Sequence, residues 1–186
     1  EKTSARAGHY DFVVMADVLE HLANPEPSLK AILQILSPGG RVLLSTPNVA
    51  FASVRLALLS GHFDYTDSGI LERTHLRFYT RNTLLRLFQA AGLNIAAELH
   101  CLRDPFAMEI NLDDLWFAPG LLWKIDRDPL SRVYQFLFFL TPSNEDHVGP
   151  KELGSRSSGL PVRFLMKKMR MLRTRVRNSL RSLGRA

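Results

Sequence analysis

The sequence has very little cysteine and no long hydrophobic run. Cys101 is the only cysteine in 186 residues, so the chain cannot form an internal disulfide and nothing in it requires an oxidising compartment. The longest apolar stretches, residues 51–59 and 134–140, are far shorter than the roughly 20 residues that a membrane-spanning helix needs. We therefore expect a cytoplasmic protein without a transmembrane segment. The chain also lacks an initial methionine and a secretory pattern, and we interpret it as an excerpt of a longer protein.

The basic charge of the sequence is confined to one end. The apolar content of 46% is typical of a globular domain. The net charge is +6, but residues 151–186 hold 11 Lys or Arg against 1 Asp or Glu, whereas residues 1–150 hold 13 against 17. The high isoelectric point is therefore no sign that the body of the protein binds nucleic acid.

Strand and helix patterns in the first 50 residues predict an α/β fold. Residues 10–18 form a continuous run of β-branched and apolar residues, which is typical of a strand buried on both faces in a parallel sheet. A helix is expected over residues 27–36, ended by Pro38-Gly39-Gly40, and a second buried strand over residues 41–46. Strand, helix and strand in this order predict a βαβ unit.

Residues 49–141 predict a long connection, a capped helix and two further strands. Residues 49–61 could be helical, and the polar and aromatic residues 62–80 form a connection of a length that often carries function. Thr80 is expected to cap a helix that stops at Gly92. Strands are expected at residues 93–102 and 131–141, paired antiparallel at one sheet edge. Between these strands, residues 112–124 contain both tryptophans and are expected to form a short helix or a lid.

The body is expected to end near residue 142, so that residues 1–142 form one domain. Residues 143–162 are rich in Ser, Gly and Pro and predict a linker. In residues 163–186 apolar residues recur at steps of three or four among Arg and Lys, which predicts a basic amphipathic helix. This helix could bind an anionic membrane surface, a nucleic acid or an acidic partner, or pack back on the domain. Its apolar stripe favours a membrane surface over nucleic acid, with the protein then peripheral to the inner face of the membrane.

Polar residues with metal-binding potential follow the first predicted strand. Ligands bind at the carboxyl ends of strands in open α/β sheets, and Asp17, Glu20 and His21 share one side if a helical turn starts at Asp17. His75 could supply a fourth ligand. Carboxylates and imidazoles suit a hard or borderline divalent cation, with magnesium as the candidate. The alternative is that these residues cap the loop or are solvated.

Other residues could bind or deprotonate a substrate. His21 and His75 are candidate general bases, because histidine titrates near neutral pH, or they are simply hydrogen-bonded histidines. Asn48 follows the second strand and could hold a substrate or cofactor through its amide, or serve as a turn residue. Tyr65 and Arg77 could line the mouth of a pocket, or pack and face solvent.

Several motifs together resemble a known family. The sequences LEHL, PGG, TPN, HLRFYT and a helix ending in AAG follow one another within residues 9–141. In this order they are similar to the C-terminal half of a class I S-adenosylmethionine-dependent methyltransferase, in the group of ubiquinone-biosynthesis O-methyltransferases. The resemblance implies a doubly wound, Rossmann-like sheet, of which this chain would form the fourth to seventh strands, side by side.

The resemblance also implies roles for individual residues. Ala16, Asp17 and Val18 match positions that face the methionine end of S-adenosylmethionine, and His21 matches a position beside the reacting centre. Related enzymes hold a divalent cation with a Glu-x-x-Glu-His cluster, in some cases with a later histidine, and here Asp17 stands at the first position. The expected reaction is methyl transfer to a hydroxyl of a small molecule, a lipid or a glycan.

The chain lacks one feature that this family implies. No glycine-rich loop precedes Tyr10, so we expect the isolated chain to bind the cofactor weakly and to be inactive. The alternative is a degenerate scaffold whose work is done by its basic tail. The oligomeric state stays open.

Overall fold

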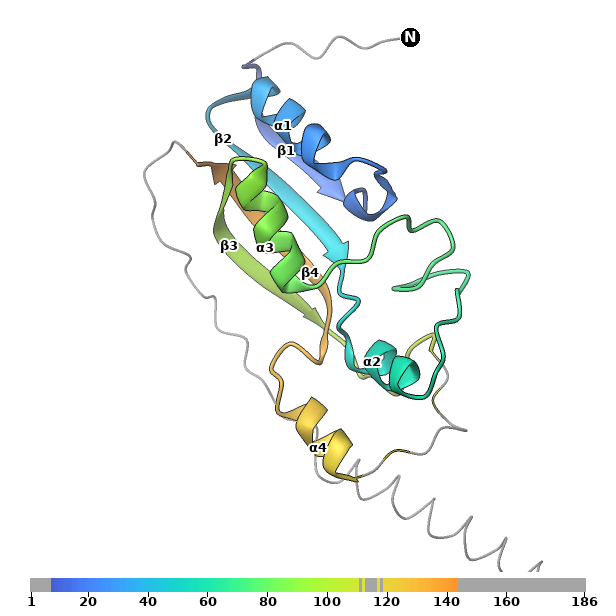
Figure 1. The fold of residues 1–186 in the computed structure, drawn as a ribbon. Helices are drawn as coiled ribbons and strands as arrows, with labels where there is room; N and C mark the ends of the chain where they lie inside the picture. Colours follow the sequence, from blue (N-terminus) through green and yellow to red (C-terminus); the bar gives the residue numbers. More distant parts are fainter. Residues whose placement is uncertain (1–7, 111, 113–116, 118, 144–186) are drawn as a thin grey trace, which may run out of the picture. The chain divides into compact units, whose positions relative to one another are not determined.

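The computed structural model describes residues 8–110, 112, 117 and 119–143, which form a mixed sheet with helices (Figure 1). The predicted basic helix at residues 163–186, and all but Ser143 of the predicted linker, lie outside the described residues. None of the helices that the structure describes is long and apolar enough to cross a membrane. The elements in chain order are β1 (Tyr10–Ala16), the 3-10 turn η1 (Leu19–His21), α1 (Pro25–Ile35), β2 (Leu36–Pro47), α2 (Ala52–Leu59), α3 (Arg81–Ala90), β3 (Leu93–Leu102), α4 (Pro119–Asp126) and β4 (Val133–Pro142).

The strands lie side by side in the order β1-β2-β4-β3. β1 and β2 are parallel and are connected through α1, which confirms the predicted βαβ unit. β4 is antiparallel to both of its neighbours, and β3 forms one edge of the sheet, as expected for the antiparallel pair. The carboxyl ends of β1 and β2 therefore meet at one edge, where the candidate residues were predicted.

The passage from α1 into β2 differs from the prediction. The helix ends at Ile35, and Pro38-Gly39-Gly40 belongs to β2 instead of separating helix from strand. Gly39 has φ +78°, and a Cβ on Gly40 would lie only 2.9 Å from the carbonyl oxygen of Tyr10. The glycines thus allow an irregular start of the strand, where the register with β1 shifts.

The helix α3 is capped as predicted. The Thr80 side chain accepts a hydrogen bond from the backbone N–H of Thr83, whose own side chain accepts one from the backbone N–H of Thr80. This reciprocal capping box satisfies backbone donors that a helix N-terminus otherwise leaves without partners. At the other end Gly92 has φ +76°, the left-handed conformation that favours glycine.

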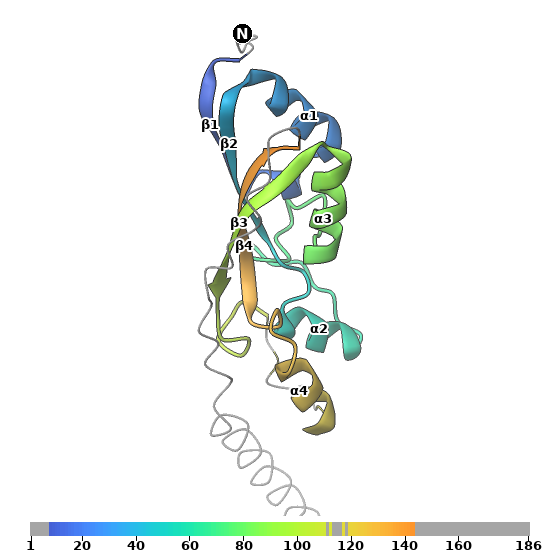
Figure 2. The same ribbon diagram turned by 90° about the vertical axis from the view of Figure 1, so that its left-hand side faces the viewer.

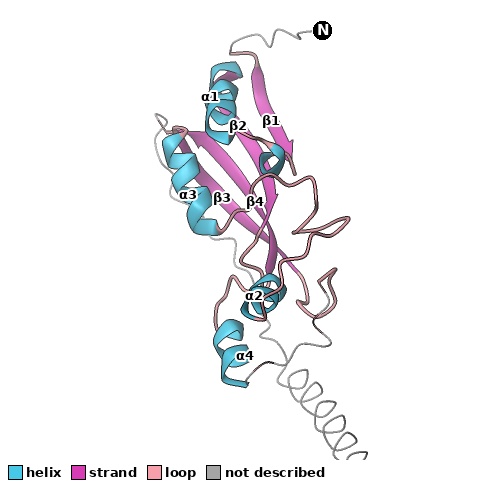
Figure 3. Cartoon of the chain, turned by 45° about the vertical axis from the view of Figure 1, so that its right-hand side comes forward, coloured by secondary structure: helices cyan, strands magenta, loops and turns pink. Residues whose placement is uncertain are grey.

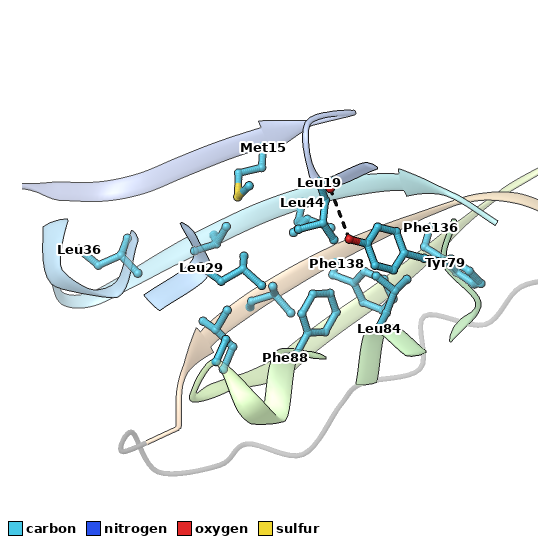
Figure 4. Close-up of a cluster of buried hydrophobic side chains, with 14 of the residues drawn as sticks. Met15, Leu19, Leu29, Leu36, Leu44, Tyr79, Leu84, Phe88, Phe136 and Phe138 are labelled. Atoms are coloured by element: carbon cyan, nitrogen blue, oxygen red, sulfur yellow. Dashed lines mark hydrogen bonds between the residues drawn. The ribbon is translucent and has the colours of Figure 1, made fainter. Parts of the chain in front are cut away.

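The main hydrophobic core lies between the sheet and the helices α1 and α3 (Figures 2 and 4). Phe88 of α3 meets Phe138 of β4 edge-on, with ring centroids 5.1 Å apart. Tyr79, just before α3, is buried in the same cluster and donates a hydrogen bond from its hydroxyl to the Leu19 carbonyl oxygen at 3.4 Å. The core therefore fixes the turn η1, which carries two of the candidate residues.

The prediction that β1 is buried on both faces is wrong for the described structure. Val13 and Met15 face the core, whereas Phe12 and Val14 are 64% and 63% exposed. Side chains alternate between the two faces of a strand, and the described helices α1 and α3 cover only one of them (Figure 2). The described residues thus form an α/β fold in which a mixed four-stranded sheet carries the helices α1 and α3 on one face.

Candidate active site

The candidate site lies directly after the carboxyl end of β1 (Figure 3). Asp17 has a left-handed backbone with φ +51°, and the helical turn begins only at Leu19, whose side chain is fully buried. The long connection before α3 passes beside this turn, because the backbone N–H groups of Leu76 and Arg77 donate to the carbonyl oxygen of Glu20 at 2.9 and 3.0 Å. These hydrogen bonds join two segments that are distant in the sequence.

Glu20 is the buried acid of the site. Its exposed fraction is 1%, and the Thr46 hydroxyl at the end of β2 donates to its Oε2 at 3.0 Å. Its other carboxylate oxygen, Oε1, is buried without a hydrogen-bond partner in the described structure. Burial raises the pKa of Glu20 above its ordinary value of 4.5, against the opposing effect of hydrogen bonds. Because a buried polar atom without a partner is costly, Oε1 is available to a proton, a cation or a ligand donor.

Both histidines are oriented by backbone carbonyl groups. Nδ1 of His21 lies 3.1 Å from the Thr74 carbonyl oxygen, and Nδ1 of His75 lies 3.0 Å from that of Ile70. A carbonyl oxygen can only accept, so Nδ1 carries the hydrogen in each ring and, in the neutral imidazole, Nε2 keeps its lone pair. This arrangement prepares a histidine to take up a proton or to bind a metal ion.

The structure brings Glu20, His21 and His75 into one group. A carboxylate oxygen of Glu20 and a ring nitrogen of each histidine all lie within 4.8 Å of one another. The ring centroids of the two histidines are 4.9 Å apart, and the rings meet edge-on. Two imidazoles and one carboxylate suit a borderline cation such as zinc, manganese or iron, whereas magnesium prefers oxygen ligands.

Asp17 lies outside this group. The helical turn expected to start at Asp17 does not form, and its carboxylate instead accepts hydrogen bonds from the Ser45 hydroxyl, at 2.9 Å, and from the Gln135 side chain. Ala16, Asp17 and Val18 are all exposed at the end of β1. They are therefore open to a ligand at the edge of the sheet where the resemblance implies the cofactor.

Both polar atoms of the Asn48 side chain form hydrogen bonds to backbone groups. Asn48 is 1% exposed, and its amide nitrogen donates to the carbonyl oxygens of Val133 at 2.8 Å and Leu130 at 3.3 Å. Its amide oxygen accepts from the backbone N–H of Ala50 at 3.0 Å. Of the two interpretations of Asn48, these contacts favour the turn residue over a group that holds a substrate.

Arg77 and Tyr65 lie on the connection that carries His75. Arg77 lines a narrow crevice together with Glu20 and His75, and its guanidinium donates to the Ala23 carbonyl oxygen. Tyr65 is 51% exposed and belongs to an aromatic cluster with Phe63 and Phe78. The ring centroid of Phe78 is 6.3 Å from that of His75, so the cluster extends from the surface to the histidine pair.

Sequence reasoning missed three residues that shape this site. Thr46 supports Glu20, and its position at the end of a strand is the signal that also pointed to Asn48. Phe63 and Phe78 carry no comparable signal, because aromatic residues in a connection most often pack in the core. Tyr79, just before α3, is buried, and burial raises its pKa to about 12, so it acts as a neutral donor.

Comparison with known proteins gives one family and several relatives. The family described as "Methyltransferase domain" matches residues 1–98. The chain is 30% identical over 114 residues to a ubiquinone biosynthesis O-methyltransferase of Aromatoleum aromaticum, which covers 60% of this chain and 48% of that protein. It is 31% identical over 93 residues to the protein of the same name in Aeromonas salmonicida, with 50% and 39% of the two chains covered. The chain thus spans at most about half the length of these curated relatives.

A solved structure is also similar. It is a SAM-dependent methyltransferase from Thermotoga maritima, described as a possible histamine N-methyltransferase. The two share 13% sequence identity with a TM-score of 0.49, over 76% of this chain and 60% of that one.

Proposed function

This chain belongs to the methyltransferase-domain family, and from that membership we propose that it carries the acceptor side of an S-adenosylmethionine-dependent methyltransferase. The reaction we propose is methylation of a hydroxyl on a small molecule, a lipid or a glycan. The observation that carries this proposal is the group of Glu20, His21 and His75 at the carboxyl end of β1. The printed names of the curated relatives, which are O-methyltransferases, support an oxygen acceptor.

For this reaction the protein must align the acceptor with the methyl donor and provide a general base. S-adenosylmethionine, when bound, supplies a methyl group that is already activated as a sulfonium. The acceptor oxygen forms a bond to the methyl carbon as the carbon–sulfur bond breaks, and the hydroxyl proton goes to Nε2 of His21 or His75. The carboxylate of Glu20 then stabilises the imidazolium that forms. The exposed segment Ala16–Val18 fits contact with the sulfonium end of the donor.

A divalent cation would fit the same residues. Glu20, His21 and His75 would hold it, and Oε1 of Glu20 is a buried oxygen that has no other partner among the described residues. A bound cation would lower the pKa of the acceptor hydroxyl and orient its oxygen. The donor set favours manganese, iron or zinc over magnesium.

The aromatic cluster beside His75 supports an acceptor with an apolar or planar part. Phe63 and Tyr65 are 38% and 51% exposed although their rings pack against Phe78. Exposed rings next to a catalytic group are surfaces on which an apolar portion of a substrate can be buried. Arg77, two residues after His75 in the sequence, carries a positive charge suited to a polar group of the acceptor.

We also propose that this chain contains only part of the cofactor site. Its parallel β1–β2 pair and its antiparallel β4, inserted between β2 and β3, are consistent with the fourth to seventh strands of the family sheet. Contacts to the ribose and adenine would then come from residues that this sequence does not include. The isolated chain is expected to bind S-adenosylhomocysteine weakly and to transfer no methyl group.

We further propose a cytoplasmic protein that is peripheral to the membrane, because residues 163–186 hold nine Lys or Arg and no acidic residue. Residues 151–186 hold eleven Lys or Arg against one acidic residue. Near an anionic surface each of these basic residues would contribute about 1 kcal/mol to the free energy of binding. Salt-dependent pelleting of the chain with anionic vesicles tests this location. Equal pelleting with neutral vesicles would contradict it.

Two measurements test the proposed reaction. Calorimetric titration of S-adenosylhomocysteine into this chain, and into any longer protein that contains it, measures the cofactor site, with and without manganese or magnesium. Transfer of an isotopically labelled methyl group to phenols, lipid hydroxyls and glycans then identifies the acceptor. Binding by the longer protein alone supports the divided site. A longer protein that binds no cofactor would contradict the methyltransferase.

A further inference from the structure

We propose that Glu109 is a positioning residue for His75: its carboxylate fixes the turn at Gly69-Ile70, and the carbonyl group of that turn sets the tautomer and direction of the His75 ring. The inference rests on the proposed function, which gives His75 its role. Glu109 lies on the segment after β3, far from the site in the sequence.

The Glu109 carboxylate joins the long connection to the sheet. Its Oε1 accepts a hydrogen bond from the backbone N–H of Ile70 at 2.9 Å and another from the hydroxyl of Tyr134, on β4, at 3.2 Å. Burial raises the pKa of Tyr134, and the nearby Glu109 carboxylate raises it further. The phenol therefore stays protonated and remains a donor to Glu109.

Gly69 shows how closely the carboxylate approaches the turn. Its φ of +95° is a conformation that other residues rarely adopt, and a Cβ at this position would lie 2.2 Å from Oε1 of Glu109. Only glycine leaves room for the carboxylate against the backbone here. On the other side of the turn, Ile70 and Leu71 are 1% exposed and pack with Phe51 and Val54. The turn is thus fixed from both sides.

The next peptide group of this turn holds His75. The carbonyl oxygen of Ile70 lies 3.0 Å from Nδ1 of His75, whose exposed fraction is 7%. Because the Ile70 N–H is held by Glu109, the direction of the adjacent carbonyl depends on that carboxylate. Nδ1–H then points to Ile70 and the lone pair of Nε2 is left for the group with Glu20 and His21. Hydrogen-bonding partners of this kind fix the tautomer and orientation of functional histidines.

The test reads the His75 tautomer directly by nitrogen NMR of the full chain labelled in its imidazole rings. In the unmodified chain His75 is expected to carry its hydrogen on Nδ1. In Glu109→Ala the Nδ1–H form of His75 is expected to fall to a minority of a tautomer mixture. Glu109→Gln keeps an acceptor oxygen and is expected to restore the original tautomer. His21, whose Nδ1 is held by Thr74, serves as an internal control and should not change.

Two further variants serve as a control and as a substitute for Glu109→Ala. Glu26→Ala removes an exposed carboxylate that is paired with Lys30 and should leave His75 unchanged. If Glu109→Ala does not fold, Tyr134→Phe removes one donor from the same carboxylate and should produce the same change to a smaller extent. An unchanged Nδ1–H tautomer in whichever of the two variants folds would overturn the role of Glu109.

Activity separates this inference from the proposed function. If the longer protein transfers methyl groups, Glu109→Ala should lower kcat/KM about tenfold, the smaller end of the effect of residues that orient a functional histidine. If it transfers none, the proposed reaction fails while the tautomer still decides whether Glu109 positions His75.

Discussion

The imidazole ring of His75 meets that of His21 edge-on, with the ring centroids 4.9 Å apart and an angle of 71° between the ring planes. One histidine follows β1 and the other belongs to the connection before α3, so the contact depends on the backbone hydrogen bonds from Leu76 and Arg77 to Glu20. Residues in direct contact that share one site do not act independently of one another. Substitutions within it are therefore expected to be non-additive.

The first prediction concerns the two histidines. In a longer protein that contains this chain, His21→Ala and His75→Ala should each lower kcat/KM for methyl transfer by about a hundredfold or more, which is the usual contribution of a general base. The kcat/KM of the double variant should be only slightly lower than that of the less active single variant, because each change disables the same group. His62→Ala is the matched control, since this exposed histidine lies on the same connection beside Asp64. Fully additive losses would contradict a shared role.

The second prediction concerns the pH dependence of stability at Glu20. Burial raises the pKa of Glu20 above 4.5, so between 4.5 and the raised value the folded protein binds more protons than the unfolded one. Stability from this residue therefore falls as the pH rises through that interval. Glu20→Gln lacks this titration and keeps an acceptor for the Thr46 hydroxyl. Its free energy of unfolding should exceed that of the unmodified protein at pH 7, and the difference should shrink toward pH 4.

Urea denaturation of both proteins at several pH values measures this difference. In a longer protein that contains this chain, the same variant should lose methyl transfer, because the amide cannot stabilise an imidazolium. A difference in unfolding free energy that is constant with pH would contradict the buried, charged carboxylate. Glu26→Gln, an exposed position, provides the control.

The parts of the fold that follow local rules could be predicted from the sequence. The cap at Thr80 and the strand at residues 93–102 depend on neighbouring residues and on hydrophobic pattern, and both are confirmed. The exposure of Phe12 could not be predicted, because a β-branched and apolar run indicates a strand without showing which faces other elements cover. The joining of Glu20, His21 and His75 could be anticipated only from the rule that ligands bind at strand ends. Asp17 lies outside the group because its backbone is left-handed, and the local sequence gives no sign of this conformation.

The third prediction concerns Asn48. Asn48→Ala removes two donors and one acceptor that satisfy buried backbone groups, at Val133 and Leu130 and at Ala50. Leaving such groups without partners costs about 1–3 kcal/mol, which should appear as a lower free energy of unfolding in urea. Asn82→Ala, at an exposed position on α3, should change it by less than about 0.5 kcal/mol. A stable Asn48→Ala with reduced acceptor affinity would instead indicate contact with the substrate.

The fourth prediction concerns Tyr65. Its ring is half exposed beside Phe63 and Phe78, so Tyr65→Ala should leave the free energy of unfolding nearly unchanged. If the cluster binds an apolar part of the acceptor, KM for that acceptor should rise while kcat changes little, because the ring contributes binding and not chemistry. Steady-state kinetics with the identified acceptor measure both quantities. Tyr10→Ala, at a tyrosine of similar exposure on β1, should leave KM unchanged.

The last prediction concerns the exposed face and edge of β1. Phe12 and Val14 are more than 60% exposed, and among the described strands β1 pairs only with β2. A long apolar edge strand offers its backbone and side chains to another chain, so this 186-residue chain by itself should self-associate as its concentration rises. The double variant Phe12→Lys with Val14→Lys should abolish this self-association, as measured by light scattering, because charged side chains oppose edge-to-edge pairing. Leu59→Lys, at an equally exposed position on α2, should not. Equal relief by Leu59→Lys would show that general surface hydrophobicity, and not the β1 edge, drives association.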